Sequence, residues 1–343
     1  MIFKKKPSGK KVALIVLNVI LSCVFVALLA FTVYAEWLMG RFYQGEEQTA
    51  TLSPEQVEAL LQEDLEETKP EGITEVKPEE VQWDVIEKQE TTDEVFNILL
   101  VGQDRRPGEI RARSDTMILI TINTRDYTVS MSSFMRDIYV QIPGYQANRL
   151  NVPYVLGGFQ SLADTLELNF GVRPDRYVEV DFSGFEKIVD TVGGVDVEMT
   201  EAEVAYFNAK FQFGATLGVN HLDGKKALTY ARCRSIEGDG DFSRTRRQRT
   251  VVAAVIAKAR TLNLVQINEA VLAMTDVLTT NLTAAEIMSY VVRFYPMLDK
   301  LAEPEQIQVP ANGTYYLGWV DGIGSVIMTD LKANSAIIAA TQK

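Results

Sequence analysis

The sequence predicts an α/β domain in which a mixed central β-sheet is sandwiched between helices (α-β-α), preceded by one transmembrane helix. From Val95 onward, apolar strand-like runs alternate with segments of helical spacing. Two neighbouring runs, Thr116–Asn123 and Tyr127–Phe134, are joined by a short turn, which predicts an antiparallel pair in an otherwise parallel sheet. Near its N-terminus the chain also has a long stretch without charged residues, Val12–Ala35.

Short apolar or β-branched runs are expected to form the strands. They are Val95–Gly102, Thr116–Asn123, Tyr127–Phe134, Ile138–Ile142, Tyr177–Phe182, Val195–Met199 and Ile307–Val309. Helices are expected where apolar residues recur every three or four positions, with Ser183 as a predicted N-cap and Gly193-Gly194 as a stop. They are Val152–Phe170, Ser183–Val192, Asp223–Arg232, Ser243–Leu262, Val265–Leu278, Ala284–Leu298 and Asp330–Thr341.

The uncharged stretch is long enough to cross a bilayer, because 24 residues of helix reach roughly 36 Å. Lysines precede it, so the positive-inside rule places the N-terminus in the cytoplasm. We therefore expect a cytoplasmic tail (1–11), a transmembrane anchor (12–38) and a single-pass protein of the cell membrane whose remainder is extracellular. A cleaved signal peptide is the alternative, although its apolar region is usually only about 7–15 residues long.

The acidity of the chain is concentrated in one segment. Residues 44–94 hold 17 Asp and Glu against three Lys, whereas residues 95–343 have a net charge of only −3. We expect residues 39–94 to be an extended acidic stalk, with a partner-binding segment as the alternative, and residues 95–343 to be one folded domain. His221 is the single histidine, which disfavours Ser/His/Asp catalysis, Cys/His catalysis and multi-histidine zinc sites.

Charged residues gather at the ends of predicted strands and helices. Asp104 follows the first strand and Asp115 directly precedes the second, so adjacent strands would bring the two carboxylates together. Such a pair repels unless a cation lies between them, and Mg²⁺ accepts one or two carboxylates plus phosphate oxygens. The plainer interpretation is that both are turn or cap residues paired with nearby arginines.

Arginines and one glutamine are the candidates for holding a phosphate group, because guanidinium groups match phosphate oxygens. An arginine-rich first turn, as after Gly240, is disfavoured by the helix dipole unless an anion lies there. Surface ion pairing and helix capping are the alternatives for each residue taken alone. A nucleic-acid site is disfavoured by the expected extracellular location. The candidates are Arg106, Arg113, Arg136, Arg149, Arg232, Arg234, Arg244 and Gln248.

Several ordered blocks in residues 95–262 resemble the LytR-CpsA-Psr family of Gram-positive cell-wall proteins. The blocks are Asp104-Arg105-Arg106, Arg113-Ser114-Asp115-Thr116, Ser133-Phe134-Met135-Arg136-Asp137, Val178–Gly194, and Arg232-Cys233-Arg234 with Asp241, Arg244 and Gln248. Two departures are Met135 where the family usually has Pro, and Arg149 where a lysine is common.

The resemblance implies a phosphotransferase that moves a glycopolymer, such as a teichoic acid or capsule, from a polyprenyl-diphosphate carrier to peptidoglycan. It implies that Asp104 and Asp115 bind Mg²⁺ and that the arginines and Gln248 bind or support the diphosphate. Arg136, Arg232 and Asp241 are the expected catalytic residues, with Asp241 either orienting arginines or accepting a proton. The alternatives are a polyprenyl-diphosphate phosphatase and a non-enzymatic lipid-carrier-binding envelope protein.

The prenyl chain of such a carrier needs an apolar groove. Ordinary core packing explains the candidate residues at least as well. The candidates for its lining are the Val251–Ile256 face and Tyr154, Val155, Leu156, Phe159, Leu162, Leu166 and Phe170.

Overall fold

The computed structural model describes Tyr34, Trp37 and residues 43–44, 68–90, 92–103, 111–236, 238, 240–274, 277–297 and 300–342. Most of the predicted anchor (12–38), much of the predicted stalk (39–94), Asp104 and Arg106 lie outside these residues. Among the described residues, no helix combines the length and the apolar character needed to span a membrane.

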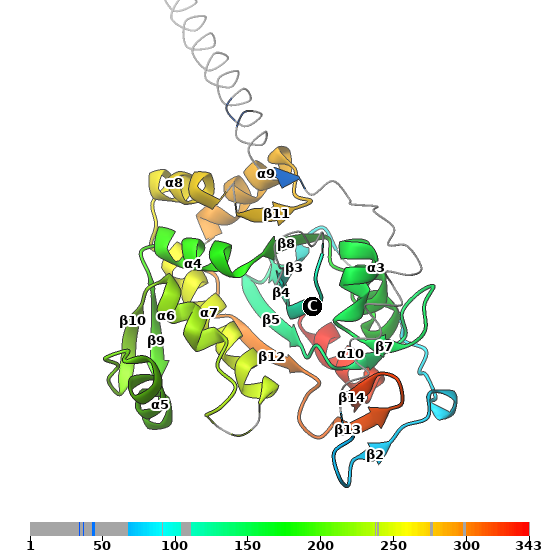
Figure 1. The fold of residues 1–343 in the computed structure, drawn as a ribbon. Helices are drawn as coiled ribbons and strands as arrows, with labels where there is room; N and C mark the ends of the chain where they lie inside the picture. Colours follow the sequence, from blue (N-terminus) through cyan, green and yellow to red (C-terminus); the bar gives the residue numbers. More distant parts are fainter. Residues whose placement is uncertain are drawn as a thin grey trace, which may run out of the picture.

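The described domain is built on a mixed seven-stranded sheet, as the alternation of strands and helices predicted (Figure 1). The strand order is β1-β11-β8-β3-β4-β5-β12. Strand β4 is antiparallel to both of its neighbours, β3 and β5, whereas β8 is parallel to β3 and β12 is parallel to β5. The strands are β1 (Tyr43–Gln44), β11 (Leu278–Thr280), β8 (Arg176–Val180), β3 (Val95–Gln103), β4 (Ser114–Asn123), β5 (Thr128–Phe134) and β12 (Glu305–Val309).

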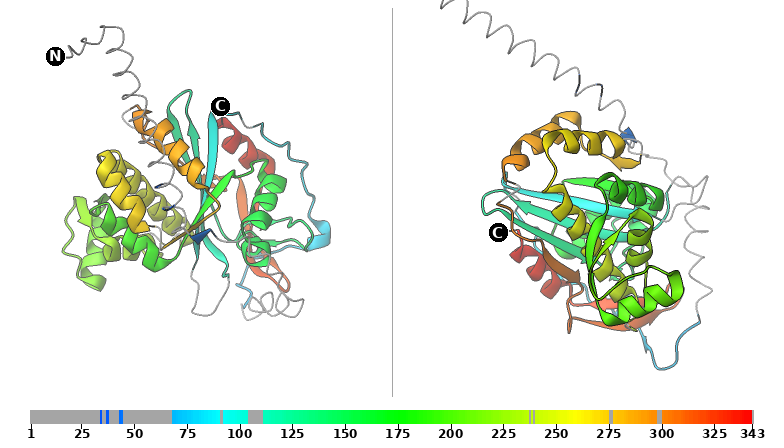
Figure 2. Two further views of the ribbon diagram at one scale, coloured as in Figure 1. Left: turned by 90° about the horizontal axis from the view of Figure 1, so that it is seen from above. Right: turned by 90° about the vertical axis from the view of Figure 1, so that its left-hand side faces the viewer.

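Helices cover both faces of this sheet, which gives the expected α-β-α layers (Figure 2). One face carries α3 (Val152–Phe170) and α10 (Leu331–Ala340); the other carries α4 (Phe182–Thr191), α6 (Gly224–Ala231) and α7 (Asp241–Ala259). The helices α8 (Leu264–Met274) and α9 (Ala284–Phe294), followed by the short η3 (Tyr295–Met297), lie near the β11 edge. Buried residues of α3 and of β3, β4 and β5 form the larger core, including Leu99, Leu119, Phe134, Leu166 and Phe170.

Three smaller sheets are attached to this framework. The first is the hairpin β9 (Val195–Met199) and β10 (Gly218–Leu222), whose connection contains α5 (Glu201–Phe211). The second combines β13 (Tyr315–Val320) and β14 (Gly324–Thr329) with β2 (Thr74–Glu75), shortly before the turn η2 (Pro78–Glu80). The third is the short ladder β6 (Tyr139–Val140) and β7 (Asn148–Arg149).

Several local expectations need correction. Asp181, not Ser183, caps α4, because its carboxylate accepts from the backbone N–H of Gly184 at 2.8 Å. The predicted helix Val265–Leu278 ends at Met274, and Leu278 begins strand β11. His221, shortly before α6, lies in β10 and pairs with Asp196 across the hairpin. The hairpin β13–β14 and the helix α5 were not predicted.

The contact between α4 and α6 is close enough to require a glycine. A Cβ atom added to Gly224 would lie 2.2 Å from the carbonyl oxygen of Glu186, and the N–H of Gly224 donates to Asp190 at 2.7 Å. These contacts hold the start of α6 against α4.

We therefore expect Gly224→Ala to lower the free energy of unfolding by about 1–3 kcal/mol, since the added methyl group forces the two helices apart. Urea unfolding followed by circular dichroism measures the change. Lys225→Ala, at the next and exposed position, is the matched control and should change stability by less than about 0.5 kcal/mol. Equal stability of both variants contradicts this account.

Candidate active site

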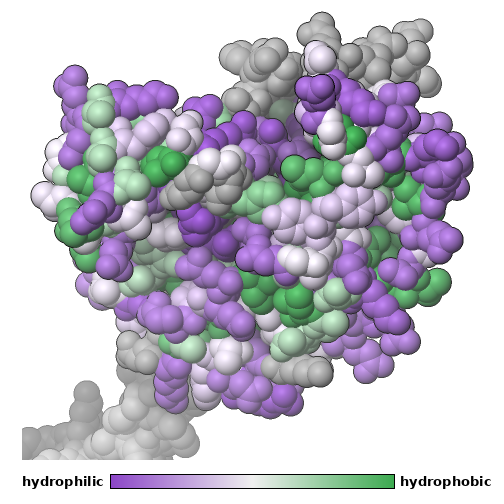
Figure 3. All heavy atoms as spheres, turned by 90° about the horizontal axis from the view of Figure 1, so that it is seen from below, coloured by the Kyte–Doolittle hydropathy of each residue, from purple (hydrophilic) through white to green (hydrophobic). Residues whose placement is uncertain are grey.

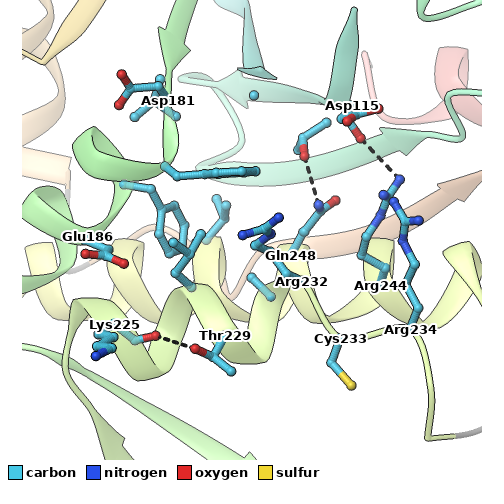
Figure 4. Close-up of a pocket in the computed structure, with 18 of the residues that line it drawn as sticks. Asp115, Asp181, Glu186, Lys225, Thr229, Arg232, Cys233, Arg234, Arg244 and Gln248 are labelled. Atoms are coloured by element: carbon cyan, nitrogen blue, oxygen red, sulfur yellow. Dashed lines mark hydrogen bonds between the residues drawn. The ribbon is translucent and has the colours of Figure 1, made fainter. Parts of the chain in front are cut away.

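A cavity of about 820 Å³ lies between the central sheet and the helices α4, α6 and α7. Polar residues occupy its two ends, as Figure 4 shows: one end carries Asp115, Arg232, Arg234, Arg244 and Gln248, and the other carries Asp181, Glu186, Lys225 and Thr229. Apolar side chains line the space between, including Leu100, Ile118, Val180, Phe182, Phe185, Leu228 and Val252. The cavity can therefore hold a molecule that is anionic at one end and apolar along its length.

Asp241 organises the arginine end of the cavity. It is the first residue of α7, and its carboxylate accepts from Arg136 Nε at 3.0 Å and from Arg244 Nη2 at 2.8 Å. It also forms an ion pair with Arg234, whose Nε lies 2.9 Å away. Arg234 binds one carboxylate oxygen, and Arg136 and Arg244 bind the other. Asp241 also places a negative charge in the first turn of α7, which offsets the unfavourable arginines there. A bound anion is thus not the only way to stabilise this helix start.

Strand pairing brings Arg136 to Asp115. Met117 in β4 faces Phe134 in β5, so the start of one strand meets the end of the other. Arg136 Nη1 donates to Asp115 Oδ1 at 2.7 Å. Burial acts to lower the pKa of Arg136, but the carboxylates of Asp137, Asp115 and Asp241 outweigh burial and raise this pKa above its ordinary value. Arg136 therefore keeps its positive charge inside the protein.

The end of α6 presents two further arginines to the cavity. Arg232 is the C-cap of α6, where a cation is favoured by the helix dipole, and its guanidinium group lies 4.0 Å from the ring centroid of Phe182. Arg234 follows two residues later, and both side chains are exposed and line the cavity. This stacking directs Arg232 along the boundary between the polar and apolar parts of the cavity.

Arg244 and Gln248 lie one turn apart on α7 and face the cavity, as their spacing predicted. Gln248 Nε2 donates to Thr116 Oγ1 at 2.8 Å. Gln248 Oε1 and Arg244 Nε are buried and have no hydrogen-bond partner among the described residues. Buried polar atoms normally have a partner, so these two atoms indicate that a ligand or water completes the site.

Other predicted site residues lie elsewhere. Arg149 is buried in β7, and its Nε donates to the carbonyl oxygen of Ser325 at 2.9 Å. Neither Arg149 nor Arg113 is among the described residues that line the cavity. Asp104 and Arg106 lie outside the described residues, so their placement stays a prediction. Of the two predicted Mg²⁺ ligands, only Asp115 is described, and it lines the cavity.

The apolar side chains of the cavity lie on the face of the sheet opposite to helix α3, from which the sequence analysis expected part of the lining. Leu156, Leu162, Leu166 and Phe170 of α3 pack in the core on the opposite face. Helices α4 and α6 supply the apolar cavity wall, and Val252 is the residue of the predicted 251–256 face that takes part. Periodicity identified the apolar face of α3 but carried no information about which side of the sheet it covers.

A buried ion pair that the sequence analysis missed supports the two arginines after α6. Arg247 is fully buried; its Nε donates to Glu203 Oε1 at 2.9 Å and its Nη1 donates to the carbonyl oxygen of Cys233 at 3.3 Å. Glu203 also accepts from the Tyr230 hydroxyl at 3.1 Å and belongs to the capping box of α5 with Thr200. Because Cys233 lies between Arg232 and Arg234, Arg247 holds the backbone that carries both side chains. In the sequence, the pattern Thr200-x-x-Glu203 is typical of a capping box and was the signal that could have predicted the start of α5 and the place of Glu203.

Removing one partner of this pair leaves the other charge buried and unpaired. We expect Glu203→Ala and Arg247→Ala each to lower the free energy of unfolding by about 3–5 kcal/mol, measured by urea unfolding. The double variant Glu203→Leu with Arg247→Met should recover part of this loss, because it leaves no buried charge. Arg125→Ala, which breaks the exposed pair with Asp126, is the control and should cost less than about 1 kcal/mol. Equal effects of Arg247→Ala and Arg125→Ala count against the pair.

Comparison with known proteins agrees with the resemblance noted in the sequence. The sequence model of the LytR_cpsA_psr family matches residues 59–338. The polyisoprenyl-teichoic acid--peptidoglycan teichoic acid transferase TagU of Bacillus cereus is 35% identical over 222 residues, which cover 64% of this chain and 70% of that protein. The protein of the same name from Enterococcus faecalis is 32% identical over 219 residues, or 63% and 70% of the two chains.

Solved structures show the same fold. A structure of TagT bound to LI-WTA matches with a TM-score of 0.60 and 26% identity, covering 80% of this chain and 97% of that chain. The crystal structure of B. subtilis TagV matches with a TM-score of 0.58 and 25% identity, covering 73% and 96%. Since the family's sequence model spans most of the chain and the folds agree, the protein belongs to the LytR_cpsA_psr family.

Proposed function

We propose that this protein transfers a glycopolymer of the teichoic acid type from a polyprenyl-diphosphate carrier to peptidoglycan. The observation that carries the proposal is the cavity with arginines at one end and apolar side chains along its length. A lipid diphosphate has the same division of charge. The names of the TagU relatives and the TagT structure bound to LI-WTA support the same reaction.

The diphosphate is placed at the arginine end and the prenyl chain between the sheet and helices α4 and α6. Arg232, Arg234 and Arg244 supply guanidinium donors, and the unpartnered Arg244 Nε adds a buried one. Arg136 adds a further positive charge to this end, where ion pairs with Asp115 and Asp241 hold it in place. A contribution of Arg106, Arg113 and Arg149 to diphosphate binding stays a prediction. Because Arg149 donates to the carbonyl oxygen of Ser325, it contributes at most indirectly.

The proposed reaction is an attack of a peptidoglycan hydroxyl oxygen on the phosphorus atom that carries the polymer. The new P–O bond forms as the bond to the prenyl phosphate breaks, so prenyl monophosphate leaves and the hydroxyl proton is released. Such transfers depend mainly on positioning and charge neutralisation. Fixed guanidinium groups in a partly buried site supply both, because they need not reorganise as charge develops.

Asp241 has the contacts of a residue that orients arginines. Three guanidinium groups occupy its two oxygens, so a role in proton acceptance requires one of these contacts to open. We therefore assign Asp241 to positioning Arg136, Arg234 and Arg244.

A divalent cation fits beside Asp115. Arg136 binds Oδ1 of this carboxylate, which can offer its second oxygen to a cation, and the side chain is one-third exposed to the cavity. Mg²⁺ needs only one or two protein carboxylates when substrate phosphates and water complete its shell. When bound, Mg²⁺ would neutralise charge on the diphosphate. Asp104 is the second predicted ligand.

The proposed location follows from the sequence. A membrane anchor at residues 12–38 and the acidic segment after it would hold the catalytic domain outside the cell, where a lipid-linked polymer and peptidoglycan are both present. Part of the predicted stalk (39–94) packs on that domain, since Thr74–Glu75 forms β2 and Val76 is buried.

Replacing the site arginines tests the reaction. We expect Arg232→Ala and Arg136→Ala each to lower transfer of labelled polymer from a lipid-diphosphate donor to peptidoglycan by at least about 100-fold. Arg125→Ala, far from the cavity in the β4–β5 turn, should retain full activity. Mass spectrometry of the product distinguishes transfer from hydrolysis. A phosphodiester-linked polymer supports transfer, whereas free polymer phosphate with no linked product indicates hydrolysis. Full transfer by both site variants refutes this site.

Removing the metal tests the role of Asp115. Chelation with EDTA should abolish transfer, and added Mg²⁺ should restore it. Asp115→Asn keeps an oxygen that can accept from Arg136 but removes the negative charge. We therefore expect the Mg²⁺ concentration for half-maximal transfer to rise at least about 10-fold, or about 1.4 kcal/mol of binding free energy. An unchanged Mg²⁺ requirement would show that Asp115 is not a ligand.

A further inference from the structure

The proposed transfer has two substrates, and the cavity described above accommodates the donor. A second cavity, of about 1020 Å³, lies beside the ladder β6–β7. Its walls come from this ladder, the start of α3, the turn between β13 and β14 and the segment at Pro78. The polar and aromatic residues that line it are Glu79, Tyr139, Tyr145, Gln146, Asn148 and Asp321.

The backbone connects this second cavity directly to the reaction centre. The N–H of Asn151 donates to the carbonyl oxygen of Arg136 at 3.1 Å, and Leu150 donates to Ile138 at 2.8 Å. Asn148, at the edge of the second cavity, is three residues before Asn151, so their Cα atoms are at most about 11 Å apart. The second cavity therefore lies one short backbone segment away from Arg136.

The second cavity differs from the first in its charges. Its described lining contains two carboxylates and no lysine or arginine. A diphosphate is disfavoured in such a place, because nothing there compensates its negative charge. The two cavities are thus suited to different substrates.

The lining matches a neutral sugar chain that carries amides and amino groups. Tyr145 is 45% exposed and offers a ring face and a hydroxyl group, and the ring of Tyr139 is held in the wall by Trp83, 5.7 Å away between centroids. Gln146 offers an amide group that both donates and accepts hydrogen bonds. The Oδ1 atom of Asn148 accepts from the N–H of Arg149 at 2.7 Å, so Asn148 contributes its amide N–H groups. The carboxylates of Glu79 and Asp321 suit an amino group on a peptide stem.

We propose that the second cavity binds the peptidoglycan acceptor and directs its hydroxyl group past β7 toward Arg136. This inference rests on the proposed function, because it assigns the second substrate of that reaction. It also gives a role to the hairpin β13–β14, which lies outside the sequence blocks that resemble the family. Tyr145 and Gln146 bind the acceptor in this assignment and take no part in binding the donor.

The test compares donor and acceptor kinetics in the full-length chain in detergent micelles. With a soluble disaccharide-tetrapeptide fragment of peptidoglycan as acceptor, we expect Tyr145→Ala and Gln146→Ala together to raise the acceptor KM at least about 10-fold. The KM for the lipid-diphosphate donor should change less than about twofold. Tyr316→Ala is the matched control, because this tyrosine is 52% exposed on β13 but does not line the cavity.

Direct binding separates this inference from the proposed function. Calorimetric titration of the same fragment into the protein without donor should show binding that the double variant loses and Tyr316→Ala keeps. If the fragment binds in this way but no transfer occurs, the proposed reaction fails and the acceptor site stands. An unchanged acceptor KM in the double variant, or equal changes in both KM values, overturns the acceptor site even when transfer is robust. Thermal unfolding confirms that each variant is folded.

Discussion

The carboxylate of Asp241 is the contact on which the arginine end of the cavity depends. Arginines from three places in the chain, after β5, after α6 and within α7, meet at this one side chain. Without Asp241, like charges would repel one another across a partly buried space, since burial reduces the screening of their repulsion. With it, the guanidinium groups are held in fixed directions and keep donors for a substrate. Asp241 thus converts a set of dispersed arginines into a preorganised anion site.

Two features of the fold place these arginines within reach of Asp241. The antiparallel pairing of β4 and β5 brings Arg136 to Asp115, and the buried Glu203–Arg247 pair holds the backbone at Cys233. A buried ion pair contributes little net stability compared with apolar packing of the same volume. Its value here is conformational, because it determines where the segment after α6 lies. The face of the molecule seen from below combines strongly hydrophilic residues near its middle with hydrophobic patches beside them (Figure 3).

The two cavities on the described residues differ in the same way as the two substrates of the proposed reaction. The first combines cations with an apolar wall, and the second combines aromatic, amide and acidic groups without a basic residue in its described lining. The residues 136–151 run between them and connect Arg136 to the ladder β6–β7. In the proposed reaction the donor and the acceptor are bound by separate surfaces, so neither substrate has to leave before the other arrives.

The sequence by itself determined the local elements and the residues at their ends. Periodicity predicted the core strands β3, β4 and β5 and the helices α3 and α7, because the repeat of apolar residues depends only on neighbours along the chain. It also placed Asp115, Arg136, Arg232, Arg244 and Gln248 at the ends or on the face where they now line or support the cavity. Tertiary structure alone decided that Asp241 binds three arginines, that Arg149 turns to Ser325, and that α4 and α6 form the apolar wall in place of α3. These outcomes depend on contacts between residues far apart in the chain, such as Arg136 with Asp241, which no local pattern encodes.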